Sequence, residues 1–84
     1  MKVWICSCEN EFGTRNLGVG STRYLALRYA AENRAQRRKR GYRWEHDSFD
    51  TNHFYGTFTR TMRMSLYTIY AVTEIELDRP ANID

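Results

Sequence analysis

The chain has 84 residues, enough for one domain near the lower size limit for a self-sufficient core. Its longest apolar runs are only a few residues, which excludes a membrane-spanning segment, and the N-terminal residues lack the features of a signal peptide. We therefore expect a cytoplasmic protein. The net charge of +3 is uneven: residues 23–63 hold ten Lys or Arg against four acids, a net +6, whereas residues 64–84 hold one Arg against four acids, a net −3. This distribution predicts a basic side that steers association with an anionic partner.

The first predicted element is a strand over residues 1–8. Val3 and Ile5 fall on one face, and Trp4, Cys6 and Cys8 on the other, so both faces are apolar, as in the interior of a sheet. Side chains two apart in a strand point the same way, about 7 Å from each other. We interpret the two cysteines as reduced, half-buried strand residues rather than as a metal or redox site.

A polar connection over residues 9–16 is expected to lead into a short return strand over residues 17–20. The glycines at positions 18 and 20 predict a bulge or a close backbone approach. Ser21 and Thr22 offer a helix N-cap, and a helix is predicted from Arg23 to about Arg38, with Gly41 as its stop signal. The apolar stripe of this helix is expected at Tyr24, Leu27, Ala30, Ala31 and Ala35, widened by Leu25 and Tyr29.

The second half of the chain predicts strands over residues 53–63 and 66–77, joined by a turn at residues 63–65. Residues 42–45 could form a brief strand, and residues 47–52 are typical of a turn. The order strand, strand, helix, strand, strand predicts an α+β fold. In it an antiparallel sheet of about four strands carries one helix on one face. We expect a single domain over residues 1–78 and a flexible tail over residues 79–84. An edge strand of such a sheet could also pair two copies of the chain, which leaves a homodimer open.

The outline resembles small uncharacterised accessory proteins that are common in bacteriophages. The likeness lies in the opening Met1-Lys2-Val3-Trp4-Ile5, the helix start Ser21-Thr22-Arg23 and the closing Ile75-Glu76-Leu77-Asp78. It implies a phage-encoded protein that acts by binding a host protein or complex, including components of antiviral defence, in the host cytoplasm. It assigns no individual residues to a site.

The most unusual segment is basic and aromatic. Six of the ten residues from Arg34 to Arg43 are Lys or Arg, and two aromatic residues follow the glycine stop. A concentrated positive charge is expected to face water or an anion. We therefore predict a partner-binding or nucleic-acid-binding surface made of Arg34, Arg37, Arg38, Lys39, Arg40, Tyr42, Arg43 and Trp44.

Three functions fit this surface. The first is a non-enzymatic protein that docks on a host protein or nucleoprotein complex and inhibits an antiviral defence system, because Arg and aromatic residues are enriched at interface hot spots. The second is a DNA- or RNA-binding module, in which arginines contact phosphates and Tyr42 or Trp44 stacks on a base. The alternative to a binding function is a solvated helix end whose arginines pair with Glu32, Glu45 and Asp47.

The third function is a small nuclease. His46, Asp47, Asp50 and His53 form a polar cluster that could supply an acid and a base. The same residue types suit a divalent metal, but the spacing matches no established motif, and a polar loop with ordinary hydrogen bonds is the preferred interpretation. We therefore predict a protein that is not an enzyme, with no cofactor, no metal and no membrane partner.

Overall fold

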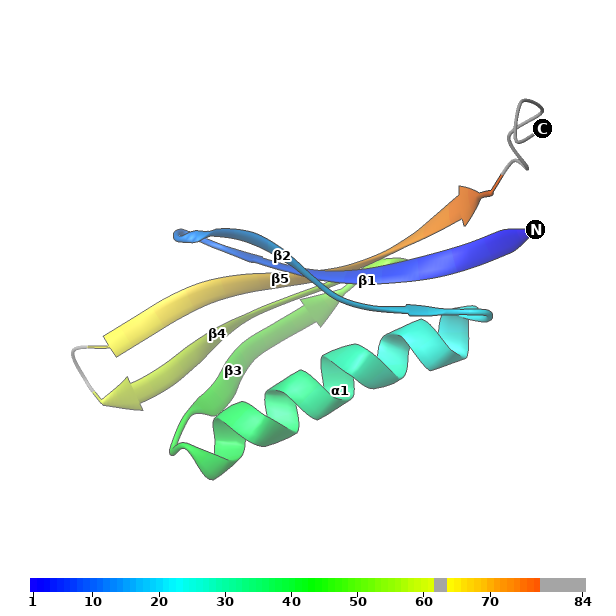
Figure 1. The fold of residues 1–84 in the computed structure, drawn as a ribbon. Coiled ribbons are helices and arrows are strands. Elements are labelled where there is room, and N and C mark those ends of the chain that lie inside the picture. The colour runs from blue at the N-terminus through cyan, green and yellow to red at the C-terminus, as the bar shows by residue number, and fades with distance from the viewer. Residues whose placement is uncertain (62–63, 78–84) are drawn as a thin grey trace.

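The computed structural model describes residues 1–61 and 64–77. The elements follow the order β1 (Lys2–Asn10), β2 (Gly13–Gly20), α1 (Arg23–Lys39), β3 (Arg43–Phe49), β4 (His53–Thr61) and β5 (Met64–Glu76). The five strands form one antiparallel sheet in the order β2-β1-β5-β4-β3, and α1 crosses one face of it (Figure 1). The predicted α+β fold is therefore confirmed. Arg63, the expected end of a strand and start of a turn, and the expected tail over 79–84 lie outside the described residues.

The sheet has one strand more than expected, and its first hairpin is longer. Residues 13–16, expected in a connection, pair with β1 and leave only a tight turn at residues 11 and 12. Residues 47–49, expected in a turn, belong to β3, which continues along β4 across a bulge between Glu45 and Ser48, where His46 has a φ of 56°. The sequence indicated only the first part of this strand, over residues 42–45, because the polar side chains that follow mark a solvent-exposed edge rather than a loop.

The core lies between α1 and the even-numbered residues of β1 and β5. Cys6, Cys8, Tyr70 and Val72 are all buried on this side, opposite Ala26 and Ala30 of the helix. The expected interior position of β1 is confirmed, since it lies between β2 and β5, and α1 covers the face that carries Cys6 and Cys8. The interpretation of the cysteines as reduced strand residues agrees with the structure, in which both are unpaired and buried, and burial is the main cause that raises the pKa of each thiol.

Helix α1 begins and ends where the sequence predicts. The Thr22 hydroxyl accepts a hydrogen bond of 3.1 Å from the backbone N–H of Leu25, which satisfies one of the free donors at the helix start. Gly41, just beyond the C-cap Arg40, has a φ of +92°, a conformation that favours glycine. Arg23 donates to the side chain of Asn52, at 3.3 Å, and to the backbone carbonyl of Thr51, and this ties the helix start to the β3–β4 loop.

The face of α1 that meets the sheet differs from the predicted stripe. Tyr24 is 71% exposed, and Ala31 and Ala35 are also exposed. The sheet-facing positions are instead Ala26, Leu27, Ala30, Asn33, Arg34 and Arg37. The prediction is confirmed for Leu27, Tyr29 and Ala30 and wrong for Tyr24, Leu25, Ala31 and Ala35. It used apolar residues alone, whereas the long stems of two arginines cover the last third of this face.

The first half of α1 lies unusually close to β2. A Cβ atom at Gly18 would lie 2.5 Å from the Tyr29 ring, and one at Gly20 would lie 2.8 Å from the backbone nitrogen of Ala26. The close approach predicted for these two glycines is therefore confirmed, and α1 packs mainly on β1 and β2. No helix within the described residues is both long and apolar enough to cross a membrane.

Candidate binding site at the basic end of the helix

The candidate site is built on an aromatic cluster at the far side of the sheet from β2. Trp44 of β3, Phe58 of β4 and Tyr70 of β5 lie on the helix-facing side, with the Trp44 ring centroid 4.8 Å from that of Phe58 and 5.6 Å from that of Tyr70. Tyr42 meets Phe58 edge-on at 6.2 Å. Gly56 makes room for this cluster, because any Cβ there would collide with the Trp44 ring.

Two of the predicted site arginines cover these rings. The guanidinium carbon of Arg34 lies 5.8 Å from the ring centroids of both Trp44 and Tyr70, and that of Arg37 lies 5.2 Å from Phe58. These distances are within the range of cation–π attraction. Arg34 and Arg37 are half-buried, so they serve as the lid of the aromatic cluster as well as a source of charge.

Packing and hydrogen bonds hold the aromatic rings of the site in place. Tyr42 and Trp44 are half-buried and pack against the core. The Trp44 indole N–H donates to the Asp47 carboxylate at 2.9 Å, and the Tyr70 hydroxyl donates to the Asn33 side-chain oxygen at 2.5 Å. Burial is the main cause that raises the pKa of the Tyr70 phenol well above its ordinary value. The rings thus form a rigid platform for the cations.

The remaining predicted cations face solvent. Arg38, Lys39, Arg40 and Arg43 are exposed where α1 ends and β3 begins. The alternative of a solvated helix end predicted ion pairs between these cations and nearby acids. Among the described residues this holds for Arg43 alone, whose side chain lies 3.5 Å from the Glu45 carboxylate. None of the other basic residues from 34 to 40 forms an ion pair with a described acid.

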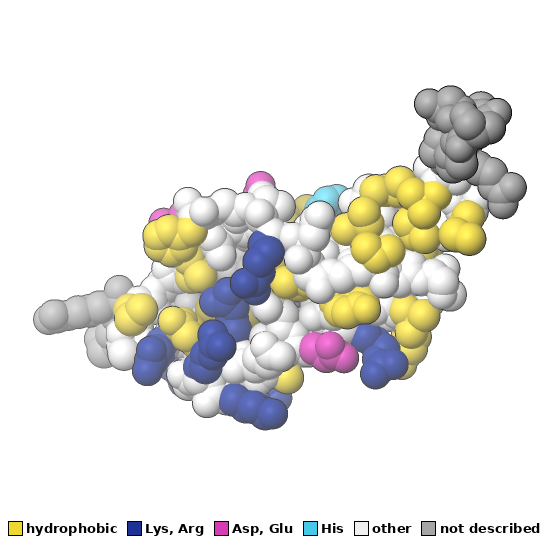
Figure 2. Space-filling model, in the orientation of Figure 1, with side chains coloured by type: hydrophobic (Ala, Val, Ile, Leu, Met, Phe, Trp, Pro, Cys, Tyr) yellow, Lys and Arg dark blue, Asp and Glu magenta, His cyan; other side chains and the backbone are white. Residues whose placement is uncertain are grey.

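Figure 2 shows that dark blue side chains gather over the C-terminal half of α1 and the neighbouring part of β3, with hydrophobic surface between them. One member of this group was missed by the sequence prediction. Arg60 of β4 is exposed, and its guanidinium carbon lies 5.7 Å from the Tyr42 ring. Strand alternation gives the signal that could have found it, because Arg60 is two residues from Phe58 and therefore shares its face. We call Arg38, Lys39, Arg40 and Arg60 the exposed cation group.

Of the predicted polar cluster, the structure brings together Asp50 and His53, with Nδ1 of His53 3.2 Å from the Asp50 carboxylate, but not all four residues as one site. Asp50 accepts hydrogen bonds from the backbone N–H groups of Asn52 and His53, at 3.0 and 2.9 Å, which makes it the cap of the β3–β4 loop. The bond from Asn52 is the main cause that holds the pKa of Asp50 below its ordinary value. Asp47 is engaged by Trp44 instead, and the described residues contain no group of three or more His, Cys, Asp or Glu that could hold a metal ion.

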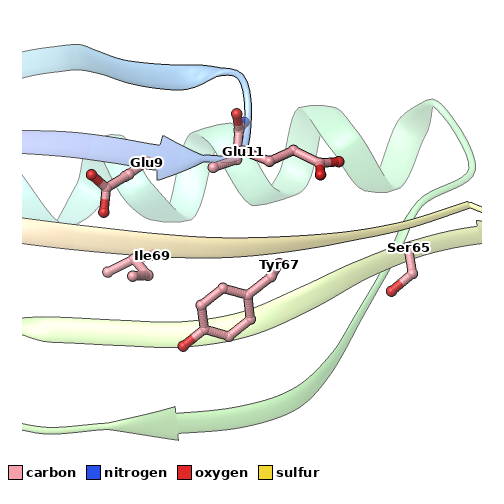
Figure 3. Close-up of a pocket in the computed structure, with 6 residues that line it drawn as sticks. Glu9, Glu11, Ser65, Tyr67 and Ile69 are labelled. Atoms are coloured by element: carbon pink, nitrogen blue, oxygen red, sulfur yellow. The ribbon is translucent and has the colours of Figure 1, made fainter.

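The opposite face of the sheet has a different chemical character. Val3, Ile5 and Ile69 lie there half-buried, and Tyr67 is 57% exposed. A hollow of about 410 Å³ is lined by Tyr67, Ile69 and Ser65 of β5 and by Glu9, Asn10 and Glu11 at the end of the first hairpin. In Figure 3 these side chains lie in front of the sheet, and the helix passes behind it. This face is apolar with acidic groups at one end, so the positive charge belongs to the helix side.

Scans against models of protein families, curated proteins and solved structures found no match to this chain.

Proposed function

We propose that this chain is a small non-enzymatic binding protein that docks on an anionic surface of a protein partner or complex through the basic end of α1. The observation that carries the proposal is the exposed cation group, which has no acidic partner among the described residues. Unpaired cations of one sign raise the local potential and favour encounter with a surface of the opposite sign.

The platform beneath these cations supports a preformed interface. Arg34 and Arg37 rest on buried aromatic rings, and Gly41 fixes the direction in which the chain leaves the helix. A rigid support lowers the entropy lost when long side chains are ordered on binding. An arginine that is half-desolvated beside an aromatic ring is also the type of residue that dominates interface energetics.

A protein partner is favoured over single-stranded nucleic acid by the state of the aromatic rings. Tyr42 lies beneath Arg37 and Arg60, and Trp44 lies beneath Arg34. Stacking on a nucleotide base requires an uncovered ring face. The resemblance to phage accessory proteins gives the proposal its concrete form, in which the partner is a host complex of antiviral defence and the site of action is the host cytoplasm.

The test is capture of partners from nuclease-treated host lysate with the wild-type chain and with a triple variant, Arg38→Glu, Lys39→Glu and Arg40→Glu. We expect a stoichiometric protein partner that survives nuclease treatment and is lost in the triple variant. Lys2→Glu is the matched control, because Lys2 is exposed at the other end of the sheet and pairs with Glu74 at 3.4 Å. A partner that the triple variant retains, or the absence of a nuclease-resistant partner, rejects the proposal.

Direct binding to DNA or RNA phosphates is the second candidate, and the same exposed cation group favours it. Four phosphate contacts predict that affinity falls by about 100-fold between about 50 and 200 mM salt. Fluorescence anisotropy with labelled single- and double-stranded oligonucleotides measures this. No binding at the lower salt concentration ends this hypothesis.

The nuclease hypothesis is tested separately. It requires cleavage of RNA or DNA that is abolished by His46→Ala or His53→Ala. The ring nitrogen Nδ1 of His53 lies 3.2 Å from the Asp50 carboxylate, a carboxylate that already caps its own loop. Inactivity of the wild-type chain with each of several divalent metals rejects this hypothesis.

A further inference from the structure

The two edges of the sheet are chemically unequal. Both edge strands contain a bulge, at Leu17 in β2 and between Glu45 and Ser48 in β3, but the β3 edge also carries a residue with positive φ at His46 and several charged side chains, which discourage pairing with another strand. The β2 edge reads Gly-Thr-Arg-Asn-Leu-Gly-Val-Gly and has a single charge, at Arg15. β2 is therefore the edge that is open to a further strand.

A groove runs along this edge between β2 and α1. It consists of two hollows of about 270 and 310 Å³ that share Tyr29 and Glu32 in their walls. The first hollow is also lined by Val19, Leu25 and Arg28, and Val19 is 53% exposed. A strand added to β2 would place alternate side chains in this groove, so the edge offers side-chain contacts as well as backbone hydrogen bonds.

The helix side of the groove carries one charge of each sign, so it can form ion pairs with the same groove of a second copy. Arg28 and Glu32 are exposed, lie one helical turn apart on the groove side of α1, and form no ion pair within the described part of the chain. In an antiparallel pair of helices related by a two-fold axis level with Ala30, Arg28 of each copy faces Glu32 of the other. An isologous interface requires this kind of self-complementarity.

The strands and helices can share that two-fold axis. The ring of Tyr29 lies against Gly18, so the middle of α1 is level with Leu17 and Gly18 of β2. An axis there pairs β2 with its copy in antiparallel fashion. Because α1 packs on β1 and β2, each helix axis lies about half a strand spacing inside the edge, and the two helices come to lie about 10 Å apart. Packed helices are separated by about 8–10 Å.

We propose that the chain forms a two-fold symmetric homodimer in which β2 pairs with β2 of the second copy and the Arg28 and Glu32 side chains pair reciprocally between the two helices. The result is a continuous ten-stranded sheet that carries both helices on one face. The basic ends of the two helices then lie at opposite ends of the dimer, because the helices are antiparallel.

The proposal is tested by light scattering coupled to size-exclusion chromatography. We expect the mass of a dimer for the wild-type chain and of a monomer for Glu32→Arg and for Arg28→Glu, each of which places like charges face to face. The double variant Arg28→Glu, Glu32→Arg restores the pairs and is expected to dimerise, as is an equimolar mixture of the two single variants. Arg38→Glu is the matched control, because it changes one exposed helix charge away from the groove and leaves the dimer intact.

A second measurement separates strand pairing from helix contact alone. Amide hydrogen exchange of residues 14–19 is expected to slow when the protein concentration is raised through the dimerisation range, and to remain fast in Glu32→Arg. Circular dichroism checks that every variant is folded. A monomeric wild-type chain, a single variant that still dimerises, a double variant or mixture that stays monomeric, or a dimer with unchanged exchange in β2 overturns the proposal.

Discussion

The two halves of α1 pack on the sheet in opposite ways. The first half approaches β2 so closely that two glycines replace side chains on the strand, and the helix contributes alanines. The second half is held away from the sheet by large rings, and arginine stems fill the space above them. Small residues bring backbones together and fix distance, whereas long cationic residues cover a surface and still present charge to solvent. One helix thus carries a structural end and an end suited to binding.

The largest expected effect comes from the aromatic platform of the second half. Phe58 is 1% exposed and contacts Tyr42, Trp44 and Tyr70, so Phe58→Ala leaves a cavity beneath the arginines. We expect a loss of about 3–5 kcal/mol in the free energy of unfolding, measured by chemical denaturation. Tyr67→Ala, on the open face of the sheet, is the control and should cost far less. Equal losses for the two variants would mean that the platform is not the core of this half.

The close contact of the first half gives the next largest effect. Gly20→Ala places a methyl group against the backbone of Ala26, which cannot turn aside, and we expect a loss of about 1–3 kcal/mol in the free energy of unfolding. Gly18→Ala meets the ring of Tyr29, a side chain that can rotate, so the loss should be smaller. Thermal unfolding of both variants shows which one loses more stability. The reverse order would show that the backbone contact is not the limiting one.

The arginines allow structural and binding roles to be separated. Arg34→Ala removes a cation above three rings, and we expect it to cost about 0.5–2 kcal/mol of stability. Arg38→Ala is exposed and should stay within about 0.5 kcal/mol of the wild type. Partner capture should show the opposite ranking if the exposed cation group makes the contact. A stability loss at Arg38 as large as that at Arg34 would remove the distinction between the lid and the exposed cation group.

The smallest effect near neutral pH concerns the buried thiol and phenol groups of the core. Burial raises the pKa of Cys6, Cys8 and Tyr70 in the folded chain, so the folded state holds protons that the unfolded state loses as the pH rises past the ordinary thiol value of 9.0. We therefore expect no change in stability from these groups below about pH 8 and a progressive fall above about pH 9. Urea unfolding at a series of pH values measures it, and Cys8→Ala should flatten the fall. A stability that rises between pH 9 and 10 would contradict this sign.

The sequence predicted the helix and the fold class because local signals agree there. Thr22 and Gly41 mark the ends of α1, and the alternation of β1 and β5 is long enough to identify both strands. The edge strand β3 was underestimated, since most of its polar side chains contact water rather than a core. The stripe of α1 was misplaced, because the positions of Arg34 and Arg37 on the sheet depend on rings that come from three other strands.

The candidate site was predicted as a list of residues but not as an arrangement. All of its positively charged members lie at one end of the molecule, yet the sequence could not show that two of them serve as a lid and that Arg60 joins them from β4. Contacts between a helix and strands distant in the chain depend on sheet order, which the local pattern does not contain. The predicted stacking role of Tyr42 and Trp44 stays a prediction.

The blocked edge at β3 has a consequence for how this chain behaves at high concentration. A sheet that could extend at both margins would add copies without limit and form fibres. In the proposed dimer, His46 and the charged side chains of β3 block one edge, so growth at the β2 edge ends once two chains have paired. A small domain can then keep an unprotected edge strand without aggregating, because pairing through that strand stops at a dimer.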